Sequence, residues 1–342
     1  MKFHVDAWDP GYGSSVEAAE GGAADSTARV DPDLEVTAAR WLPVPAPATD
    51  EIDWPGAILF VDGVLRIEAR LWIEQPEVHP DTGEILGTDA GMALCASYGA
   101  GVVCSCPQGA HLMSGEVRHG LFTGVADAVS LATTAGTYEM HHTPLDNSDN
   151  PINVLTGSLQ GKLNELELIT AANARVSLVE HGVTGDDDLI VIDGPLRGRT
   201  SLPRAIGYIK SHRATYLPPE LQAKVGQLAA GERTPVFLMG TSWDRHSWYL
   251  RLPSRPGAPW TGIVRIECSA DLPTEEAVRL ADESQRVLPR YASTEYKDTR
   301  APQNLVPIAG LERELRRRLG HPGLLNRALR TASAARAAGG GE

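Results

Sequence analysis

The sequence predicts an α/β protein in which a mixed sheet is flanked by helices, with insertions and a helical extension toward the C-terminal end. Three observations predict this class. Apolar runs with strand character lie on both sides of one long segment with helical periodicity, and further strands and helices then follow in mixed order. The last apolar pattern before residue 330 is again helical.

The first strands are expected between residues 57 and 124. Residues 57–74, AILFVDGVLRIEARLWIE, begin as an apolar strand, have a possible break near Gly63, and continue with the alternation of a half-exposed partner strand. Residues 92–106, MALCASYGAGVVCSC, predict another strand, and EVRHGLFTG after them predicts a shorter one.

A long amphipathic helix is expected over residues 153–180. Leucines recur there at spacings of three and four, which is the periodicity of one helix face, namely Leu155, Leu159, Leu163 and Leu166. A buried strand at 188–193, DLIVID, follows this helix. The remaining pattern predicts a strand in RAIGYIKSHR, a helix in PPELQAKVGQLAAGE, strands in TPVFLMG, SWYLRLP and GIVRIEC, and helices in TEEAVRLADESQRVL and IAGLERELRRRLG.

The domain organisation follows from the segments without periodicity. Residues 1–54 predict an irregular acidic arm, and residues 55–330 one domain. Within that domain, residues 107–150 are expected to form an insertion or a long loop. Residues 331–342, which end in AAGGGE, are expected to be a disordered tail.

Composition restricts the class of protein. No apolar run approaches the roughly 20 residues that a membrane helix needs, and the N-terminal residues lack the pattern of a signal peptide, so we expect a cytoplasmic protein. The four cysteines are expected to be reduced residues on or beside strands, since a Cys-x-Cys pair alone is weak support for a metal site. They are Cys95, Cys104, Cys106 and Cys268.

Charge is distributed unevenly along the chain. The formal net charge of −13 argues against a protein that is basic all over, as many nucleic-acid binders are. Residues 1–54 carry eleven acidic and three basic residues, whereas residues 286–330 carry four acidic and ten basic residues. A basic surface for phosphate contacts is therefore expected only locally.

Two apolar strands each end at an Asp-Gly pair. Asp62 and Gly63 follow AILFV, and Asp193 and Gly194 follow LIVI. Each pair taken alone is a common turn signal, and Asp62-Gly63 could join two strands of a hairpin. Two such pairs, with the acidic helix LNELEL between them, favour a cluster of hard oxygen ligands for Mg²⁺ or Mn²⁺, which can support phosphoryl displacement.

These segments resemble the NurA nucleases, whose domain has a ribonuclease H-like fold. The resemblance covers roughly residues 55–330 and depends on FVDGVLR, LNELEL, LIVIDGPL, IGYIKSHR, WYLRLP and GIVRIEC. It implies a metal-dependent, usually Mn²⁺-dependent, deoxyribonuclease that hydrolyses phosphodiester bonds in DNA end processing, repair or defence. It also implies a homodimer that works with a hexameric HerA-type ATPase.

The resemblance assigns roles to individual residues. Asp62 and Asp193 are implied as metal ligands, together with one of Glu165 and Glu167, which lie about 200° apart around the helix axis. Glu165 is slightly preferred, and Mn²⁺ or Mg²⁺ is the implied ion. Lys210 is implied as a catalytic lysine that contacts phosphate. A DNA-binding rim would be formed by Lys210, Arg197, Arg199, Arg204 and Arg213.

The C-terminal motif departs from the family pattern. Many members have a Tyr-Pro segment leading to an active-site histidine, whereas this chain has QNLVPIAGLERELRRRL. Glu312 stands in the histidine position and could supply a metal-ligating oxygen, and His321 comes too late. The departure leaves open a second function, a catalytically reduced dimeric adaptor that docks on a HerA-type ATPase.

Other enzyme classes find little support. A Gly-x-x-x-x-Gly-Lys-Ser/Thr phosphate loop is absent, so ATP hydrolysis would have to come from a partner. The segment GTSWDRHSW lacks the features of a nucleophile elbow. An aromatic content of 6% offers little for a sugar-binding cleft.

Overall fold

The computed structural model of the chain describes residues 28–47, 54–79, 82–146, 150–180, 187–198, 200–212, 214–255 and 257–339. The chain divides into two compact units. Unit 1 comprises Met1–Val61, Val103–Leu112 and Ala171–Leu311, and unit 2 comprises Asp62–Val102, Met113–Thr170 and Glu312–Glu342. The expected domain over residues 55–330 therefore contains parts of both units.

Unit 1 is built on a mixed sheet. Its strands lie in the order β3–β2–β7–β8–β11–β10–β9–β1. The strands β2, β7 and β8 are parallel to one another, and β8, β11, β10, β9 and β1 are paired antiparallel. Their bounds are β1 Arg29–Asp31, β2 Ala57–Val78, β3 Ile85–Cys106, β7 Asp188–Asp193, β8 Ala205–Ile209, β9 Phe237–Gly240, β10 Asp244–Arg251 and β11 Ile263–Ser269.

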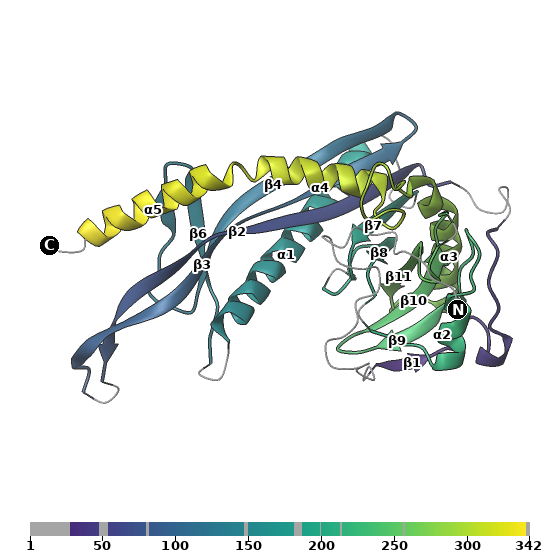
Figure 1. Ribbon diagram of the computed structural model, residues 1–342, viewed down its shortest axis with the longest axis horizontal. Helices are drawn as coiled ribbons and strands as arrows, with labels where there is room; N and C mark the ends of the chain where they lie inside the picture. Colours follow the sequence, from purple (N-terminus) through teal and green to yellow (C-terminus); the bar gives the residue numbers. More distant parts are fainter. Residues whose placement is uncertain are drawn as a thin grey trace. The chain divides into compact units, whose positions relative to one another are not determined.

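Helices cover the sheet of unit 1. Helix α3 (Thr274–Val287) runs beside β10 and β11 (Figure 1), and its apolar face joins the main core with Trp248 and Val264. The indole Nε1 of Trp248 donates a hydrogen bond to Ser284 Oγ of this helix at 3.1 Å. The apolar residues that recur with helical periodicity in 274–287 thus form the helix face that packs on the sheet.

The described part of the N-terminal arm is packed rather than loose. It contains β1 and the short 3₁₀ helix η2 (Ala38–Arg40). Trp41 is 1% exposed and shares a second core with Phe237 of β9 and Val225 of helix α2 (Pro219–Val225). Burial of this indole, about 2 to 3 kcal/mol of apolar transfer free energy, ties the arm to unit 1.

Unit 2 contains strands of different lengths, and helix α1 (Pro151–Glu180) is one of the helices that pack on them. Its strands lie in the order β2–β3–β4–β6–β5, where β4 is Gly109–Thr123, β5 is Leu131–Thr133 and β6 is Gly136–His142. Helix α1 buries its leucine face against β3 residues such as Leu94 and Tyr98. The expected helix and its four leucines are confirmed, since none of the four is more than 3% exposed.

Two consecutive helices follow residue 305. Helix α4 (Val306–Arg318) begins in unit 1 and is followed by α5 (Pro322–Gly339). Leu329 of α5 is wholly buried in a core of unit 2 with Cys95 and Tyr138. The expected disorder from residue 331 is corrected, because α5 continues to Gly339.

Two further expectations are corrected. Residues 57–78 form one continuous strand, so Asp62 and Gly63 do not form a turn between two strands. Residues 107–150 are not a long loop, because they contain β4, β5 and β6. Polar, turn-rich sequence around short strands concealed their pairing.

The expected fold class is confirmed. The molecule has a large mixed sheet flanked by helices and a helical C-terminal part. No helix in the described part of the chain is both long and apolar enough to cross a membrane.

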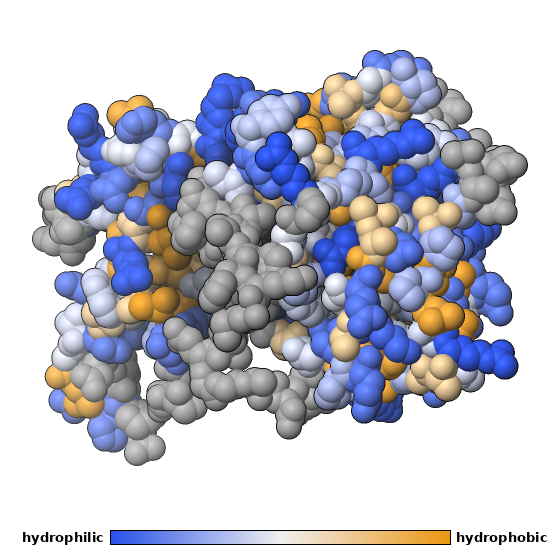
Figure 2. Space-filling model, turned by 45° about the vertical axis from the view of Figure 1, so that its right-hand side comes forward, coloured by the Kyte–Doolittle hydropathy of each residue, from blue (hydrophilic) through white to orange (hydrophobic). Residues whose placement is uncertain are grey.

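Surface composition varies over short distances. On the face shown in Figure 2, hydrophobic residues lie in small groups among hydrophilic ones. Large hydrophobic side chains with substantial exposure occur in both units, for example Leu42 and Tyr296 in unit 1 and Trp72 in unit 2.

Candidate functional site

Asp193 stands where β7 stops. The four preceding residues are buried, and Gly194 adopts a φ of +96°, a conformation that glycine tolerates best. The Gly194 N–H donates to the carbonyl oxygen of Tyr208 at 2.8 Å, which fixes the chain as it leaves the strand. The Asp193 side chain is 16% exposed, so its carboxylate is accessible from a defined position.

Lys210 provides the nearest positive charge to Asp193. Its Nζ donates hydrogen bonds to Asp193 Oδ2 at 2.7 Å and to Asn304 Oδ1 at 3.0 Å. Asn304 is wholly buried and donates from Nδ2 to Asp298 Oδ2 at 2.8 Å. The lysine is thus held by a carboxylate and by an amide whose orientation is itself fixed.

Asn304 and Asp298 are functional candidates that the sequence analysis missed. Both lie in residues 293–305, a stretch with few regular elements. Isolated polar residues in such a stretch carry no spacing signal. Only the fold brings Asn304 to Lys210, which is 94 positions away in the chain.

A buried carboxylate supports the turn after Asp193. Glu267 of β11 is fully buried and accepts a hydrogen bond from the backbone N–H of Leu196 at 2.8 Å. Its other oxygen pairs with Arg265 at 2.8 Å and Arg245 at 3.2 Å. Burial lowers the pKa of Arg245, and the charge of Glu267 opposes that effect. This cluster holds residues 194–196 in place.

Asp62 and Glu167 are buried carboxylates of unit 2, with 6% and 5% exposure. Asp62 Oδ1 accepts a hydrogen bond from the Gly63 N–H at 2.8 Å. A Cβ atom at Gly63 would lie 2.4 Å from Glu167 Oε1 and 2.7 Å from Leu163 Cδ1. The absence of a side chain at Gly63 therefore lets the Glu167 carboxylate approach the strand beside Asp62.

Glu165 faces away from this region. Its side chain is 52% exposed and pairs with Lys162 at 2.7 Å, and that contact lowers the pKa of Glu165. The choice of Glu165 or Glu167 as a metal ligand stays a prediction, and Glu167 is the less exposed of the two. Their separation around the helix axis was expected, but leucine spacing alone did not establish which one faced the sheet.

Glu312 belongs to the α4 segment of unit 2. Its carboxylate accepts hydrogen bonds from Arg316 Nε and Nη2, at 3.1 and 2.9 Å. The side chain is 17% exposed. A metal ion bound through Oε1 of Glu312 would have to share that oxygen with Arg316.

The expected arginine rim is only partly present. Arg197 is exposed, as a DNA contact requires, while Arg199 and Arg213 lie outside the described residues. Arg204 is a structural residue: it donates to both oxygens of Glu283 at 2.8 and 2.9 Å and to the Asp188 carbonyl at 2.7 Å. Its place in a free basic rim is corrected.

The four cysteines are free, as expected, and burial raises the pKa of Cys95 and Cys104 to about 12. Within the described part of the chain, one group of three His, Cys, Asp or Glu side chains brings its ligand atoms within 4.8 Å of one another. It consists of Cys104, Cys106 and His111 of unit 1. The Cys-x-Cys spacing alone did not predict a metal site, because His111 lies beyond the turn and joins the two thiols only in the fold.

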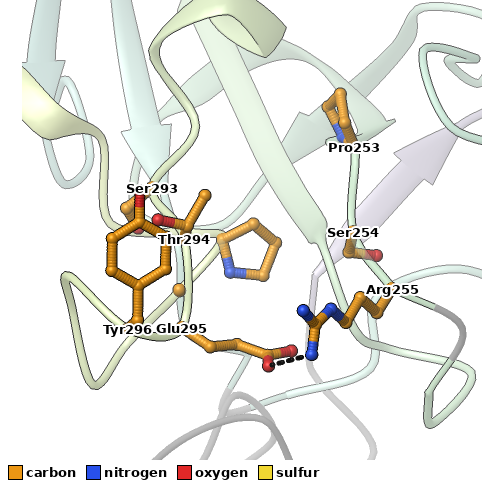
Figure 3. A pocket seen from close by; sticks show the side chains of 9 residues that line it. Pro253, Ser254, Arg255, Ser293, Thr294, Glu295 and Tyr296 are labelled. Carbon is orange, nitrogen blue, oxygen red and sulfur yellow. Dashed lines mark ion pairs between the residues drawn. The ribbon is translucent and has the colours of Figure 1, made fainter.

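A pocket of about 430 Å³ lies elsewhere in unit 1, between residues 253–255 and 293–302 (Figure 3). Arg255 and Glu295 face each other at its opening, 3.7 Å apart, and Tyr296 lies on one side. Both members of this ion pair are more than half exposed. Exposed pairs of this kind are weak, and the pocket lining offers no group of metal ligands.

The chain was compared with protein families, curated proteins and solved structures. The chain matches no protein-family model and no curated protein. Among solved structures it is similar to the NurA nuclease from Sulfolobus solfataricus, with a TM-score of 0.45 and 11% sequence identity, over 85% of this chain and 88% of that chain.

Proposed function

We propose that the protein is a metal-dependent deoxyribonuclease that hydrolyses phosphodiester bonds, with Asp62, Glu167 and Asp193 as metal ligands. Glu165 is a weaker candidate because of its exposure and its pairing with Lys162. Mn²⁺ is the proposed ion, with Mg²⁺ as the substitute. Carboxylate oxygens are hard donors, so the chemistry of this donor set fits either ion.

The observation that carries the proposal is the register of β2 with β7. These strands are paired in parallel within unit 1 up to Val61 and Ile192. The next residues in sequence are Asp62 and Asp193. Each carboxylate therefore comes directly after a buried residue that is paired in the sheet, so the backbone that leads to it is fixed by that pairing.

The metal ion and the side chains of the protein have different roles in the proposed reaction. A divalent ion supplies Lewis-acid stabilisation of the charge that develops on the phosphoryl oxygens. The carboxylates hold it, and the turn at residues 194–196, supported by Glu267, fixes the position of Asp193. Lys210, oriented by Asn304, adds a fixed positive charge for a neighbouring phosphate. Arg197 offers an exposed contact for the DNA backbone.

A biological role follows only as part of the proposal. We propose that the enzyme processes DNA ends, in repair or in defence, as a homodimer with a HerA-type hexameric translocase. The chain has no phosphate loop of its own, so DNA translocation would require such a partner.

One observation favours a second function, a catalytically reduced adaptor for the same ATPase. Asp193 is paired with Lys210, and Glu312 with Arg316, so two of the proposed oxygen donors already have cationic partners. Together with the changed C-terminal motif, this pairing would suit a protein whose metal affinity is weak.

Cleavage of linear duplex and single-stranded DNA with Mn²⁺ tests the proposal. Native chain, Asp62→Ala, Asp193→Ala and, as a matched control, Asp244→Ala should be compared, since Asp244 is an exposed acid of β10. We expect activity in the native chain and in Asp244→Ala, and loss of about 100-fold or more in the other two. Cleavage that survives both substitutions would reject the metal site, and an inactive native chain with its ATPase present would favour the adaptor.

A further inference from the structure

A second candidate metal site lies at the turn between β3 and β4, within unit 1. Cys104 and Cys106 are two positions apart on β3, so their side chains leave the same face of the strand. Pro107 and Gln108 form the turn, and His111 follows on β4. The hairpin thereby brings two thiols and an imidazole from eight consecutive residues together, with ligand atoms within 4.8 Å of one another.

The donor set is soft and differs from the carboxylates. Thiolate and imidazole ligands favour Zn²⁺ and related ions, whereas Mn²⁺ and Mg²⁺ prefer oxygen. In a tetrahedral zinc site with bond lengths of about 2.0 to 2.3 Å, neighbouring ligand atoms lie roughly 3.5 to 3.8 Å apart. The side chains would therefore need shifts of about 1 Å or less.

The surroundings suit an ion that enters from solvent. Cys104 is fully buried, Cys106 is partly exposed and His111 is exposed, so the group is anchored on one side and open on the other. His111 Nδ1 lies 3.4 Å from the Gly109 carbonyl oxygen. A proton on Nδ1 that is donated to this carbonyl leaves Nε2 as the nitrogen that binds metal.

Gln108 can supply the fourth ligand of a tetrahedral zinc ion. Gln108 Oε1 accepts a hydrogen bond from Cys106 Sγ at 2.9 Å, so it already lies beside one proposed ligand. It or a water molecule can complete four-coordination. On binding, each thiol releases one proton to solvent and no electron is transferred.

We propose that Cys104, Cys106 and His111 bind one Zn²⁺ ion per chain and fasten the β3–β4 turn. This site is independent of the proposed nuclease centre, both in its residues and in the class of ion. Loss of nuclease activity would therefore say nothing about it.

Titration of the full-length chain with Co²⁺, under a non-chelating reductant, tests the site by spectroscopy. We expect thiolate-to-cobalt charge-transfer absorption that saturates at one ion per chain and is displaced by Zn²⁺ but not by excess Mn²⁺. Cys106→Ser and His111→Ala should each weaken Zn²⁺ binding by about tenfold or more, since even loss of an outer-shell partner costs that much.

Matched controls separate ligation from general damage. Cys95→Ala removes a thiol of unit 2, and His142→Ala removes an exposed strand histidine, so both should bind Zn²⁺ like the native chain. Circular dichroism should confirm that Cys106→Ser and His111→Ala fold. Cobalt spectra without thiolate bands, displacement by Mn²⁺, or equal affinity in folded Cys106→Ser would each overturn the proposal.

Discussion

Lys210 donates from Nζ to Oδ2 of Asp193 at 2.7 Å, and the two side chains are 15% and 16% exposed. The ammonium group therefore neutralises the carboxylate at the position where the proposed function requires a metal ion. A cation that pairs with Asp193 both preserves the local geometry and competes with the ion. Lys210 is thus expected to weaken metal binding and to assist cleavage, and a single substitution can separate these two effects.

Lys210→Met should raise the apparent affinity for Mn²⁺ while lowering the cleavage rate. Removal of the competing charge is expected to lower the Mn²⁺ midpoint of activity by about tenfold, because the ion no longer has to displace the ammonium group from Asp193. The rate at saturating Mn²⁺ should fall by about tenfold or more, because the phosphate loses a fixed cation. Titration of cleavage with Mn²⁺ measures both. Lys162→Met is the control, and an unchanged midpoint in Lys210→Met would show that the lysine does not compete for Asp193.

The two glutamates of α1 offer an isosteric comparison. Glu167→Gln should lose about 100-fold or more of Mn²⁺-dependent cleavage, because a buried ligand is replaced by a neutral amide. Glu165→Gln should retain activity within about twofold and lose only about 0.2 to 0.5 kcal/mol of stability, the size of an exposed helix ion pair. Single-turnover cleavage and urea denaturation give the two readouts. The opposite ranking of the two variants would return Glu165 to the site.

Periodicity made much of this fold predictable. The long helix and its leucine face, the strand that ends at Asp193, and the helices α3 and α4 follow from apolar spacing that reports burial directly. Strand β2 was divided incorrectly because Asp-Gly is a turn signal in isolation. Its conformation is instead decided by the approach of α1, a tertiary contact.

Site residues could not be predicted correctly where the hydrogen-bond partner of the side chain lies far away in the sequence. Arg204 was placed in a basic rim because it lies among other arginines, but its partner Glu283 is 79 positions away and faces it only in the fold. Asn304 was missed for the same reason. The ranking of Glu165 and Glu167 required the position of Gly63, which sequence spacing does not give.

Gly63→Ala should destabilise the protein through direct overlap. The added Cβ would meet Glu167 Oε1 at 2.4 Å and Leu163 Cδ1 at 2.7 Å, so the helix or the strand must shift. We expect a loss of about 1 to 3 kcal/mol, the usual cost of overpacking. Gly161→Ala is the matched control. Gly161 lies on α1, the helix that carries Glu167 and Leu163, and a Cβ there meets nothing within 4 Å. That variant should gain about 0.5 to 1 kcal/mol from helix propensity. Equal stabilities in denaturant titrations would contradict the close approach of Glu167.

Two arginines that are close in sequence should separate DNA binding from stability. Arg204→Gln breaks a bidentate pair with Glu283, whose side chain is 7% exposed, and should cost about 3 kcal/mol of unfolding free energy. Arg197→Gln should leave stability within about 0.5 kcal/mol but weaken DNA binding and reduce its salt slope by about one. Binding to duplex DNA across a range of salt, beside thermal unfolding, distinguishes the two. A stable Arg204→Gln with weakened DNA binding would restore Arg204 to the rim.

His212 should make the protein less stable as the pH falls below neutrality. Its ring packs beside Tyr249 and Trp260, and the residue is 8% exposed; burial lowers its pKa from 6.5 to about 4. Nearby Arg265 adds to that shift, while the contact with the Ile263 carbonyl at 3.1 Å opposes it. Between pH 6.5 and 4 the unfolded chain binds the extra proton, so the contribution is complete above pH 6.5 and is lost as the pH falls toward 4. From pH 7 to pH 5 this group should account for a loss of about 2 kcal/mol in the free energy of unfolding.

Urea denaturation between pH 7 and pH 5 tests this prediction on the native chain, His212→Gln and the exposed control His142→Gln. The free energy of unfolding should decline less steeply with falling pH only in His212→Gln. A parallel decline in all three would mean that His212 is protonated in the folded state as readily as in the unfolded one.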